Sequence, residues 1–482
     1  MTVADVIADG LGRAGASRVF AVRSAIGGGL LEAIERRGLT ATTVAPASEA
    51  CVMAAVLGTI VGVPGAVVIG DGLMEAVDGL RYAFSNRCPV IVMTSGASGM
   101  TAAELLGVTK ATLAVGAGSG AHWIAHACQL AMTEPWGPVH LEVPREVAAA
   151  AALPVATSCR PAPLPAPDPA ALDAAARVIE TAERPLVVAG RLCRSAADAA
   201  WIRAFAEARP APVLVTPQAH GVLPDPHPLV IGTLGAGEAE RAILESADLV
   251  VAIAVDPIEV PSNAWPTGTA VLELTPVVPE ASRGDRAPAM VVGDIGLILE
   301  ELAPRLRDRR FAEWDVARLH ALKQAAAVAP AGARQLAAFR VVDAVRRLTP
   351  AGTIAVFESG EVCPAGARAW QAVAPGECLI ASGPATERFA VAAATAAQLA
   401  RPERRVVCFT DAGAIRGTRE PFEPVVALGV PVVIVVLGDS ATPAVPLPTG
   451  LRAFAADSSA TVATVFETAL AAGTPALVTV SL

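Results

Sequence analysis

The chain is 482 residues long, and 53% of its residues are hydrophobic while only 4% are aromatic. Its formal net charge is −9 and it has no long basic run, which argues against a nucleic-acid-binding surface built on positive charge. This length predicts about three domains. A core of Ala, Val, Leu and Ile suits buried parallel strands covered by alanine-rich helices.

The compartment is predicted from the cysteines and the N-terminus. Eight cysteines are scattered with no Cys-x-x-Cys pair, so we expect reduced thiols in a cytoplasmic protein. The first 15 residues alternate charged and apolar side chains as an amphipathic helix does, and they lack a signal-peptide core. Residues 50–70 are uncharged and long enough to cross a bilayer, but Gly62, Pro64 and Gly65 divide them into a helix and a strand. We therefore expect no membrane span.

Short β-branched runs alternate with helical patterns along the whole chain, which is typical of βαβ units with parallel sheets. Two stretches, Leu153–Leu172 and Gln324–Gln335, have the composition of linkers. We predict an α/β protein with three consecutive doubly wound parallel-sheet domains, over residues 1–155, 156–330 and 331–482. The expected strands are residues 66–69, 89–93 and 139–143, then 185–189, 212–215 and 248–253, then 353–356, 405–409 and 432–437.

An ordered series of short motifs runs along the chain. In the first segment the motifs are residues 15–20 (GASRVF), 48–50 (SEA), 62–68 (GVPGAVV), 70–80 (GDGLMEAVDGL), 88–94 (CPVIVMT) and 137–147 (GPVHLEVPREV). This series resembles the pyrimidine-binding domain of the thiamine-diphosphate-dependent enzymes of the acetolactate synthase and 2-keto-acid decarboxylase type. Residues 184–190 (RPLVVAG) and 223–235 (LPDPHPLVIGTLG) resemble the central domain of that family, and residues 400–413 (ARPERRVVCFTDAG) and 428–440 (LGVPVVIVVLGDS) its diphosphate-binding domain.

The resemblance implies a catalytic role for Glu49. In the family a buried carboxylate at this place hydrogen-bonds the aminopyrimidine ring of the cofactor and favours loss of the thiazolium proton. The apolar neighbours Ala50, Cys51 and Val52 suit such a buried acid. The other interpretation is a glutamate that only stabilises a helix N-terminus.

The resemblance also implies a Mg²⁺ and diphosphate site. Asp411 and Asp439 stand where the family places its metal ligands, and the backbone carbonyl near Ala441 would complete the set. Ser382, Gly383 and Gly413 would neighbour the diphosphate, and Gly72 would neighbour the cofactor. The family's Gly-Asp-Gly motif is altered here, because Thr410 and Ala412 flank Asp411. The added methyl groups are expected to crowd a phosphate.

A second interpretation keeps the scaffold without thiamine diphosphate. Arg388 falls where the family has a bulky apolar residue beneath the thiazolium ring, and Ala21–Ser24 replaces a family loop near the substrate. Arg388, Arg23 and Arg416 could then bind an anionic substrate, although the more common role of any one such arginine is a surface ion pair. His122 and His126 share one helical stripe and could hold a metal, relay a proton or simply lie packed or exposed.

A third interpretation is a non-catalytic partner subunit. The resemblance implies a cofactor site formed at the interface of two subunits. We therefore expect a homodimer or homotetramer in which Glu49 of one chain faces Asp411 of the other. The substrate would be a 2-keto acid or another small anion. The glycine run at residues 232–237 is interpreted as a loop, so no FAD is expected. Only 43 residues follow Asp439 in the printed sequence, from which a reduced C-terminal lid is expected.

Overall fold

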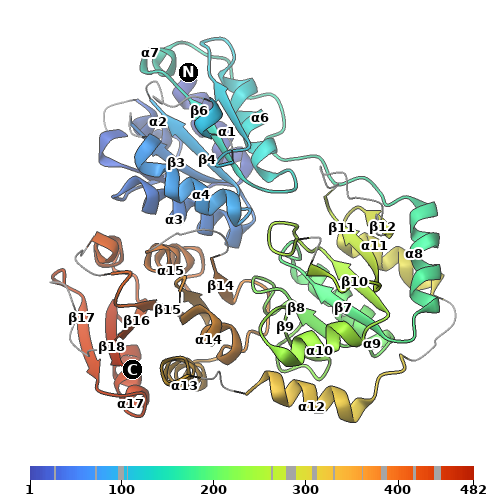
Figure 1. The fold of residues 1–482 in the computed structure, drawn as a ribbon. Coiled ribbons are helices and arrows are strands. Elements are labelled where there is room, and N and C mark those ends of the chain that lie inside the picture. Colours follow the sequence, from blue (N-terminus) through green and yellow to red (C-terminus); the bar gives the residue numbers. More distant parts are fainter. Residues whose placement is uncertain are drawn as a thin grey trace. The chain divides into compact units, whose positions relative to one another are not determined.

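The computed structural model describes residues 1–25, 29–70, 73–95, 102–105, 107–261, 264–277, 289–306, 312–328, 332–360, 362–381, 388–415, 420–438 and 447–482. Three six-stranded parallel sheets follow one another along the chain, each interleaved with helices (Figure 1). The predicted fold class is therefore confirmed.

The first sheet has the strand order β2-β1-β3-β4-β6-β5. Its apolar strands β3 and β4 are buried along their whole length, which explains their continuous β-branched runs. The strands are β1 (Arg18–Ala21), β2 (Thr40–Thr43), β3 (Gly65–Ile69), β4 (Val90–Thr94), β5 (Ala111–Ala114) and β6 (Pro138–Glu142). The helices are α1 (Val3–Ala14), α2 (Leu30–Arg36), α3 (Ala47–Val61), α4 (Val77–Ser85), α5 (Ala102–Leu105), α6 (Gly120–Met132) and α7 (Arg145–Ala149).

The uncharged run at residues 50–70 divides as predicted. Helix α3 ends at Gly62, which has a left-handed backbone (φ 76°), and strand β3 begins at Gly65. A Cβ on Gly65 would overlap the backbone carbonyl of Ala54, so the strand packs directly against the helix that precedes it. Among the described helices, none is both long and apolar enough to span a membrane.

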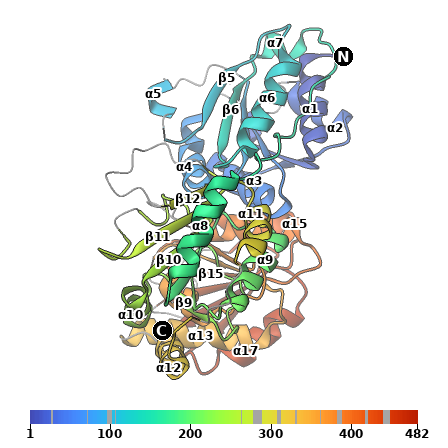
Figure 2. The same cartoon turned by 90° about the vertical axis from the view of Figure 1, so that its right-hand side faces the viewer.

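The second sheet has the order β12-β11-β10-β7-β8-β9. Alternate side chains of its central strands face two helical layers: Val187 and Val251 pack with α8, α9 and α11, whereas Leu186 and Val250 pack with α10 and α12. These helices and strands are labelled in Figure 2. The strands are β7 (Pro185–Ala189), β8 (Val213–Val215), β9 (Val230–Thr233), β10 (Leu249–Ile253), β11 (Ala270–Thr275) and β12 (Ala289–Val292). The helices are α8 (Pro169–Thr181), α9 (Ala196–Ala208), α10 (Glu238–Ser246), α11 (Ile295–Leu302) and α12 (Val316–Ala326).

The third sheet has the order β14-β13-β15-β16-β18-β17. Its strands are β13 (Ile354–Phe357), β14 (Cys378–Ile380), β15 (Val406–Asp411), β16 (Val433–Gly438), β17 (Arg452–Ala456) and β18 (Ala476–Ser481). Its helices are α13 (Ala333–Leu348), α14 (Val362–Ala369), α15 (Phe389–Ala400), α16 (Glu423–Ala427) and α17 (Val462–Ala471).

The predicted linkers are shorter than expected. Asp168 caps α8, with its carboxylate accepting hydrogen bonds from the backbone N–H groups of Ala170 and Ala171, so the helix starts inside the first proposed linker. The second proposed linker overlaps the end of α12 and the start of α13. Composition alone misplaced these ends because alanine suits both linkers and helices.

The residues group into two compact units. One contains Met1–Pro163, Ala381–Asp457 and Glu467–Ser481, and the other contains Leu164–Ile380 and Ser458–Phe466. Within the first unit α3 packs on α15, and the Tyr82 and Phe389 rings stack with centroids 5.1 Å apart. In the same unit Arg401 donates a 3.0 Å hydrogen bond from Nη2 to the backbone oxygen of Ile60.

Candidate active site

Parallel α/β sheets bind ligands at the carboxyl ends of their strands, at the point where the strand order reverses. In the first sheet that point is beside β1, because β2 and β3 lie on its two sides. Helix α3 follows β2, so its first turn lies at the same edge of the sheet. Glu49 is in that turn, and the topology therefore supplies a reason for an acid there.

Glu49 is held in a closely packed setting. Its helix begins after Pro46, and the Glu49 residue is only 6% exposed. A Cβ on Gly79 would overlap the backbone oxygen of Ser48 and lie 2.7 Å from the Cβ of Cys51, so α4 packs directly against this turn. The helix N-terminus favours a negative charge while burial opposes it, and a carboxyl group under these two opposing effects suits proton transfer.

Asp411 is the last residue of β15, at the carboxyl edge of the third sheet. Its Oδ1 accepts a 2.8 Å hydrogen bond from the backbone N–H of Ala414, which fixes both the side chain and the turn. A carboxylate oxygen at this edge of a sheet is of the kind that Mg²⁺ prefers, so the position of Asp411 is compatible with the expected role.

The two alterations of the family's Gly-Asp-Gly motif fit the described turn. Thr410 is fully buried within β15, so its methyl group belongs to the core. Ala412 lies beside Gly438 of β16: a Cβ added at Gly438 would be 2.8 Å from the Cβ of Ala412. The missing side chain at Gly438 therefore leaves room for the methyl group at Ala412. Gly413 lies close to the Asp411 carboxylate: a Cβ added at Gly413 would be 3.0 Å from Asp411 Oδ1.

Arg388 stands directly before α15, is exposed and has a left-handed backbone (φ 70°). Only a few non-glycine residues adopt this conformation, which costs on the order of 1 kcal/mol. Arg23 is also exposed, in a 3₁₀ turn after β1. Gly72, Ser382, Gly383, Arg416, Asp439 and Ala441, which sequence analysis assigned to the site, lie outside the described residues.

The structure adds an acid that sequence analysis did not single out. Glu358 follows β13 directly and is 1% exposed. It comes directly after the last residue of β13, whereas Asp411 is itself the last residue of β15. The signal in the sequence was an acidic residue immediately after a buried apolar run, at Phe357-Glu358.

The glycine run of the central sheet surrounds side chains of the protein itself. A Cβ on Gly232 would lie 2.7 Å from Glu240 Oε1, and a Cβ on Gly237 would lie 2.6 Å from Arg368 Nη2. Glu240 is 2% exposed in the first turn of α10, and burial raises its pKa. This carboxyl group fills the helix N-terminus at which a nucleotide phosphate would bind, which favours the interpretation of the run as a loop.

His122 and His126 both lie exposed on α6, with parallel rings 6.0 Å apart between centroids. Trp123 contacts both rings. In the described part of the chain, no group of three or more His, Cys, Asp or Glu side chains is arranged to hold a metal. The two histidines and Trp123 form an aromatic cluster on the surface of α6.

Comparisons with known proteins agree with this architecture. Three family models match in order: the N-terminal TPP binding domain of thiamine pyrophosphate enzymes at residues 1–111, the central domain at 172–302 and the C-terminal TPP binding domain at 358–446. Together they cover more than half of the chain. The protein belongs to the thiamine pyrophosphate enzyme family.

Individual relatives are distant. The chain is 24% identical to the catabolic acetolactate synthase of Raoultella terrigena, over 86% of this chain and 79% of that protein. It is 25% identical to the large subunit of acetolactate synthase isozyme 1 of Escherichia coli, spanning only 53% of that relative's length. It is 23% identical to mouse 2-hydroxyacyl-CoA lyase 1, over 81% of this chain and 72% of the mouse protein.

One solved structure shares the fold over the whole chain. It is a putative thiamin diphosphate-dependent enzyme from Mycobacterium smegmatis, with a TM-score of 0.83 and 23% identity, and it covers 100% of this chain and 99% of the other. At this identity the likeness supports the fold and leaves the substrate open.

Proposed function

We propose that this protein is a thiamine-diphosphate-dependent lyase or ligase that breaks or forms a carbon–carbon bond next to the carbonyl group of a 2-keto acid. The observation that carries the proposal is Glu49, a buried acid on the first turn of α3 at the carboxyl edge of the first sheet. The acetolactate synthases among its relatives favour a 2-keto acid as the substrate.

The roles of the protein's own residues follow from their settings. Glu49 would hold a proton at a nitrogen of the cofactor's pyrimidine ring, because a buried carboxyl group binds and releases protons near neutral pH more readily than an exposed one. Asp411 Oδ2 would bind Mg²⁺, with Asp439 and the carbonyl of Ala441 as further proposed ligands. When bound, thiamine diphosphate would supply the electron sink for the electron pair that stays on the substrate's carbonyl carbon when the adjacent carbon–carbon bond is broken.

The glycines and the remaining candidates would shape the site. Gly413 allows the backbone to come close to the diphosphate, and Ser382, Gly383 and Gly72 are proposed as further neighbours of the cofactor. Arg388 is proposed to meet the substrate carboxylate, since its guanidinium group offers a bidentate fork. The proposed assembly is a homodimer or homotetramer, in which Glu49 of one subunit faces Asp411 of its partner.

Calorimetric titration with thiamine diphosphate and Mg²⁺ tests this proposal. Wild-type protein should bind the cofactor, and Asp411→Ala should weaken binding by about 100-fold because a metal ligand is lost. Asp457→Ala, which removes an exposed aspartate of the same unit, is the matched control and should leave binding unchanged. An absence of binding to the wild-type protein at millimolar cofactor would overturn the proposal.

A second measurement tests the chemistry. Release of carbon dioxide from pyruvate and longer 2-keto acids should fall by about 10²- to 10³-fold in Glu49→Gln, since a positioned acid or base contributes a factor of this size. Glu146→Gln removes an exposed carboxylate of the same domain and should retain full activity. Equal rates in Glu49→Gln and wild type would exclude Glu49 from the reaction.

A further inference from the structure

The turn that follows β15 is attached to the neighbouring strand of the third sheet. Strands β15, β16 and β18 lie side by side in that sheet (Figure 1), and Asp411 of β15 is paired with Leu437 of β16. One residue further on, the backbone N–H of Ala412 donates a 2.9 Å hydrogen bond to the backbone oxygen of Leu437. This bond holds Ala412 beside the carboxyl end of β16.

The same turn holds the Asp411 carboxylate in one direction. The backbone N–H of Ala414 donates to Asp411 Oδ1 at 2.8 Å, and a Cβ added at Gly413 would be 3.0 Å from that oxygen. Ile415, the next residue, is 1% exposed, so the core anchors the far end of the turn. Because both contacts to the carboxylate come from the backbone of residues 412–414, a displacement of the turn would move the carboxylate with it.

The turn and β16 meet at a contact that has room for one methyl group. A Cβ added at Gly438, the last residue of β16, would lie 2.8 Å from the Cβ of Ala412, closer than such atoms approach each other in folded proteins. Gly438 is held on its other side by β18, where Ser481 is its partner. A Cβ atom is fixed to the backbone and cannot rotate away. A second methyl group would therefore displace the turn.

We infer that Gly438 and Ala412 form a steric pair that positions Asp411: Gly438 must lack a side chain for the turn to hold the carboxylate in its direction. All three residues lie in the same compact unit. The inference rests on the proposed function for its consequence, since Asp411 is the proposed Mg²⁺ ligand. Mg²⁺ requires nearly ideal octahedral geometry, with oxygens at about 2.1 Å, so a displaced ligand binds it more weakly. Gly438 is a positioning residue that acts through Ala412.

Hydrogen exchange of the protein without cofactor tests the structural half of this inference. Gly438→Ala should lower the protection of the backbone amides at positions 412 and 414 by about tenfold, because the added methyl group weakens both hydrogen bonds of the turn. Adding Ala412→Gly removes the opposing methyl group and should bring protection back to within about threefold of wild type. Ala412→Gly alone completes the double-mutant cycle and should also stay within about threefold of wild type.

Gly118→Ala is the matched control for these variants. It adds a methyl group to the same compact unit at a position where nothing lies within 4 Å of a Cβ, so it should leave the turn unchanged. Unchanged protection in Gly438→Ala, or a double variant that exchanges as fast as the single one, would overturn the inference. If Gly438→Ala does not fold, recovery of folded protein in the double variant supports the pair, and failure to recover it overturns the pair.

Affinity for the metal tests the functional half. In calorimetry at saturating thiamine diphosphate, Gly438→Ala should raise the Kd for Mg²⁺ by about tenfold, as when the contacts that orient a metal ligand are lost. The double variant should recover most of this loss, and Gly118→Ala should bind as wild type does. Equal Kd values for Gly438→Ala and wild type, despite lower protection, would overturn the positioning role. If wild-type protein binds no cofactor, the proposed function fails, whereas the exchange cycle still decides whether the pair fixes the turn.

Discussion

His140, on β6, is a fully buried ionisable side chain of the first domain. The residue is 0% exposed, and its Nε2 lies 2.9 Å from Thr94 Oγ1. Its Nδ1 has no recorded hydrogen-bond partner among the described residues. Burial lowers the pKa of His140 to about 4, because the apolar strands around it cannot solvate a charged imidazolium.

This histidine predicts a loss of stability in mild acid. In the unfolded chain His140 takes up a proton near pH 6.5, whereas in the folded protein it stays neutral down to about pH 4. Neutral His140 therefore makes its full contribution to the free energy of unfolding above pH 6.5. This contribution falls as the pH drops from 6.5 toward 4. The expected decrease in the free energy of unfolding is about 2 kcal/mol between pH 7.5 and pH 5.

Urea unfolding at a series of pH values measures this decrease. His140→Gln should flatten the pH dependence, because glutamine can still bond Thr94 and takes up no proton. His122→Gln removes an exposed histidine from the same domain and should leave the slope as in wild type. A slope that is unaltered in His140→Gln would contradict the assignment.

At the scale of elements, the position of Glu49 depends on how closely α4 approaches α3. Gly79 permits this approach, since a Cβ there would overlap Ser48 O. The clash is with backbone, which cannot turn aside as a flexible side chain can. Gly79→Ala should therefore push the first turn of α3 outward and destabilise the protein by about 2 kcal/mol.

The same substitution should reduce activity beyond its effect on stability, because a small displacement of a catalytic acid is costly. Thermal unfolding and the rate at saturating cofactor, measured at a temperature where the variant is folded, separate the two effects. Gly118→Ala is the control, since nothing lies within 4 Å of a Cβ added at Gly118. A Gly79→Ala enzyme as stable and active as Gly118→Ala would refute the close packing.

At the scale of the whole molecule, the proposed assembly predicts complementation between subunits. Glu49→Gln and Asp411→Ala homodimers should each be inactive. In a mixed dimer one site carries both changes and the other carries neither. Random exchange of subunits should then restore about a quarter of wild-type activity, because half of the dimers are mixed and half of their sites are intact.

Activity after mixing, together with sedimentation, checks this prediction. The sedimenting species should have at least twice the 48.8 kDa mass of the chain. Two Glu49→Gln preparations mixed with one another form the control and should stay inactive. A monomeric protein, or a mixture without activity, would contradict a site in which Glu49 of one subunit meets Asp411 of its partner.

The sequence by itself predicted an α/β fold of three parallel sheets and nine of the eighteen described strands, three in each sheet, with ends within two residues of those observed. Continuous β-branched runs such as residues 432–437 are buried on both faces of a parallel sheet, and this pattern is local and repeated. The resemblance to the family also implied roles for Glu49 and Asp411, because each stands within one of the matching motifs. The linker ends were less well predicted, since alanine-rich segments satisfy helices and linkers alike.

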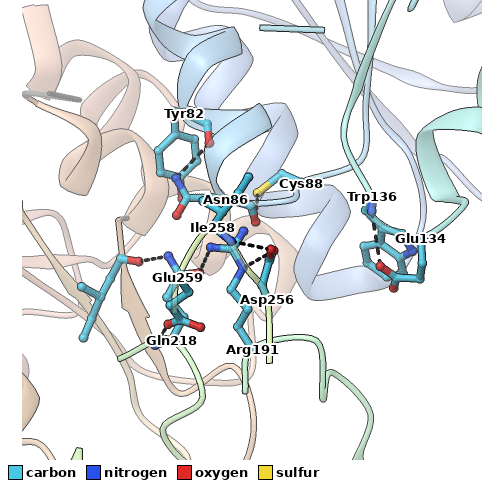
Figure 3. Close-up of polar contacts among 11 residues, drawn as sticks. Tyr82, Asn86, Cys88, Glu134, Trp136, Arg191, Gln218, Asp256, Ile258 and Glu259 are labelled. Atoms are coloured by element: carbon cyan, nitrogen blue, oxygen red, sulfur yellow. Dashed lines mark hydrogen bonds and ion pairs between the residues drawn. The ribbon is translucent and has the colours of Figure 1, made fainter. Parts of the chain in front are cut away.

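Only the tertiary structure decided which departures from the family motifs the fold accommodates. Ala412 fits because Gly438, 26 positions along the chain, has no side chain. Gln218 reaches Ile380 across 162 positions, and Arg191 meets Asp256 across the strand reversal of the central sheet (Figure 3). Such contacts depend on strand order and on where each strand ends. A local sequence pattern carries neither, because packing between distant segments sets both.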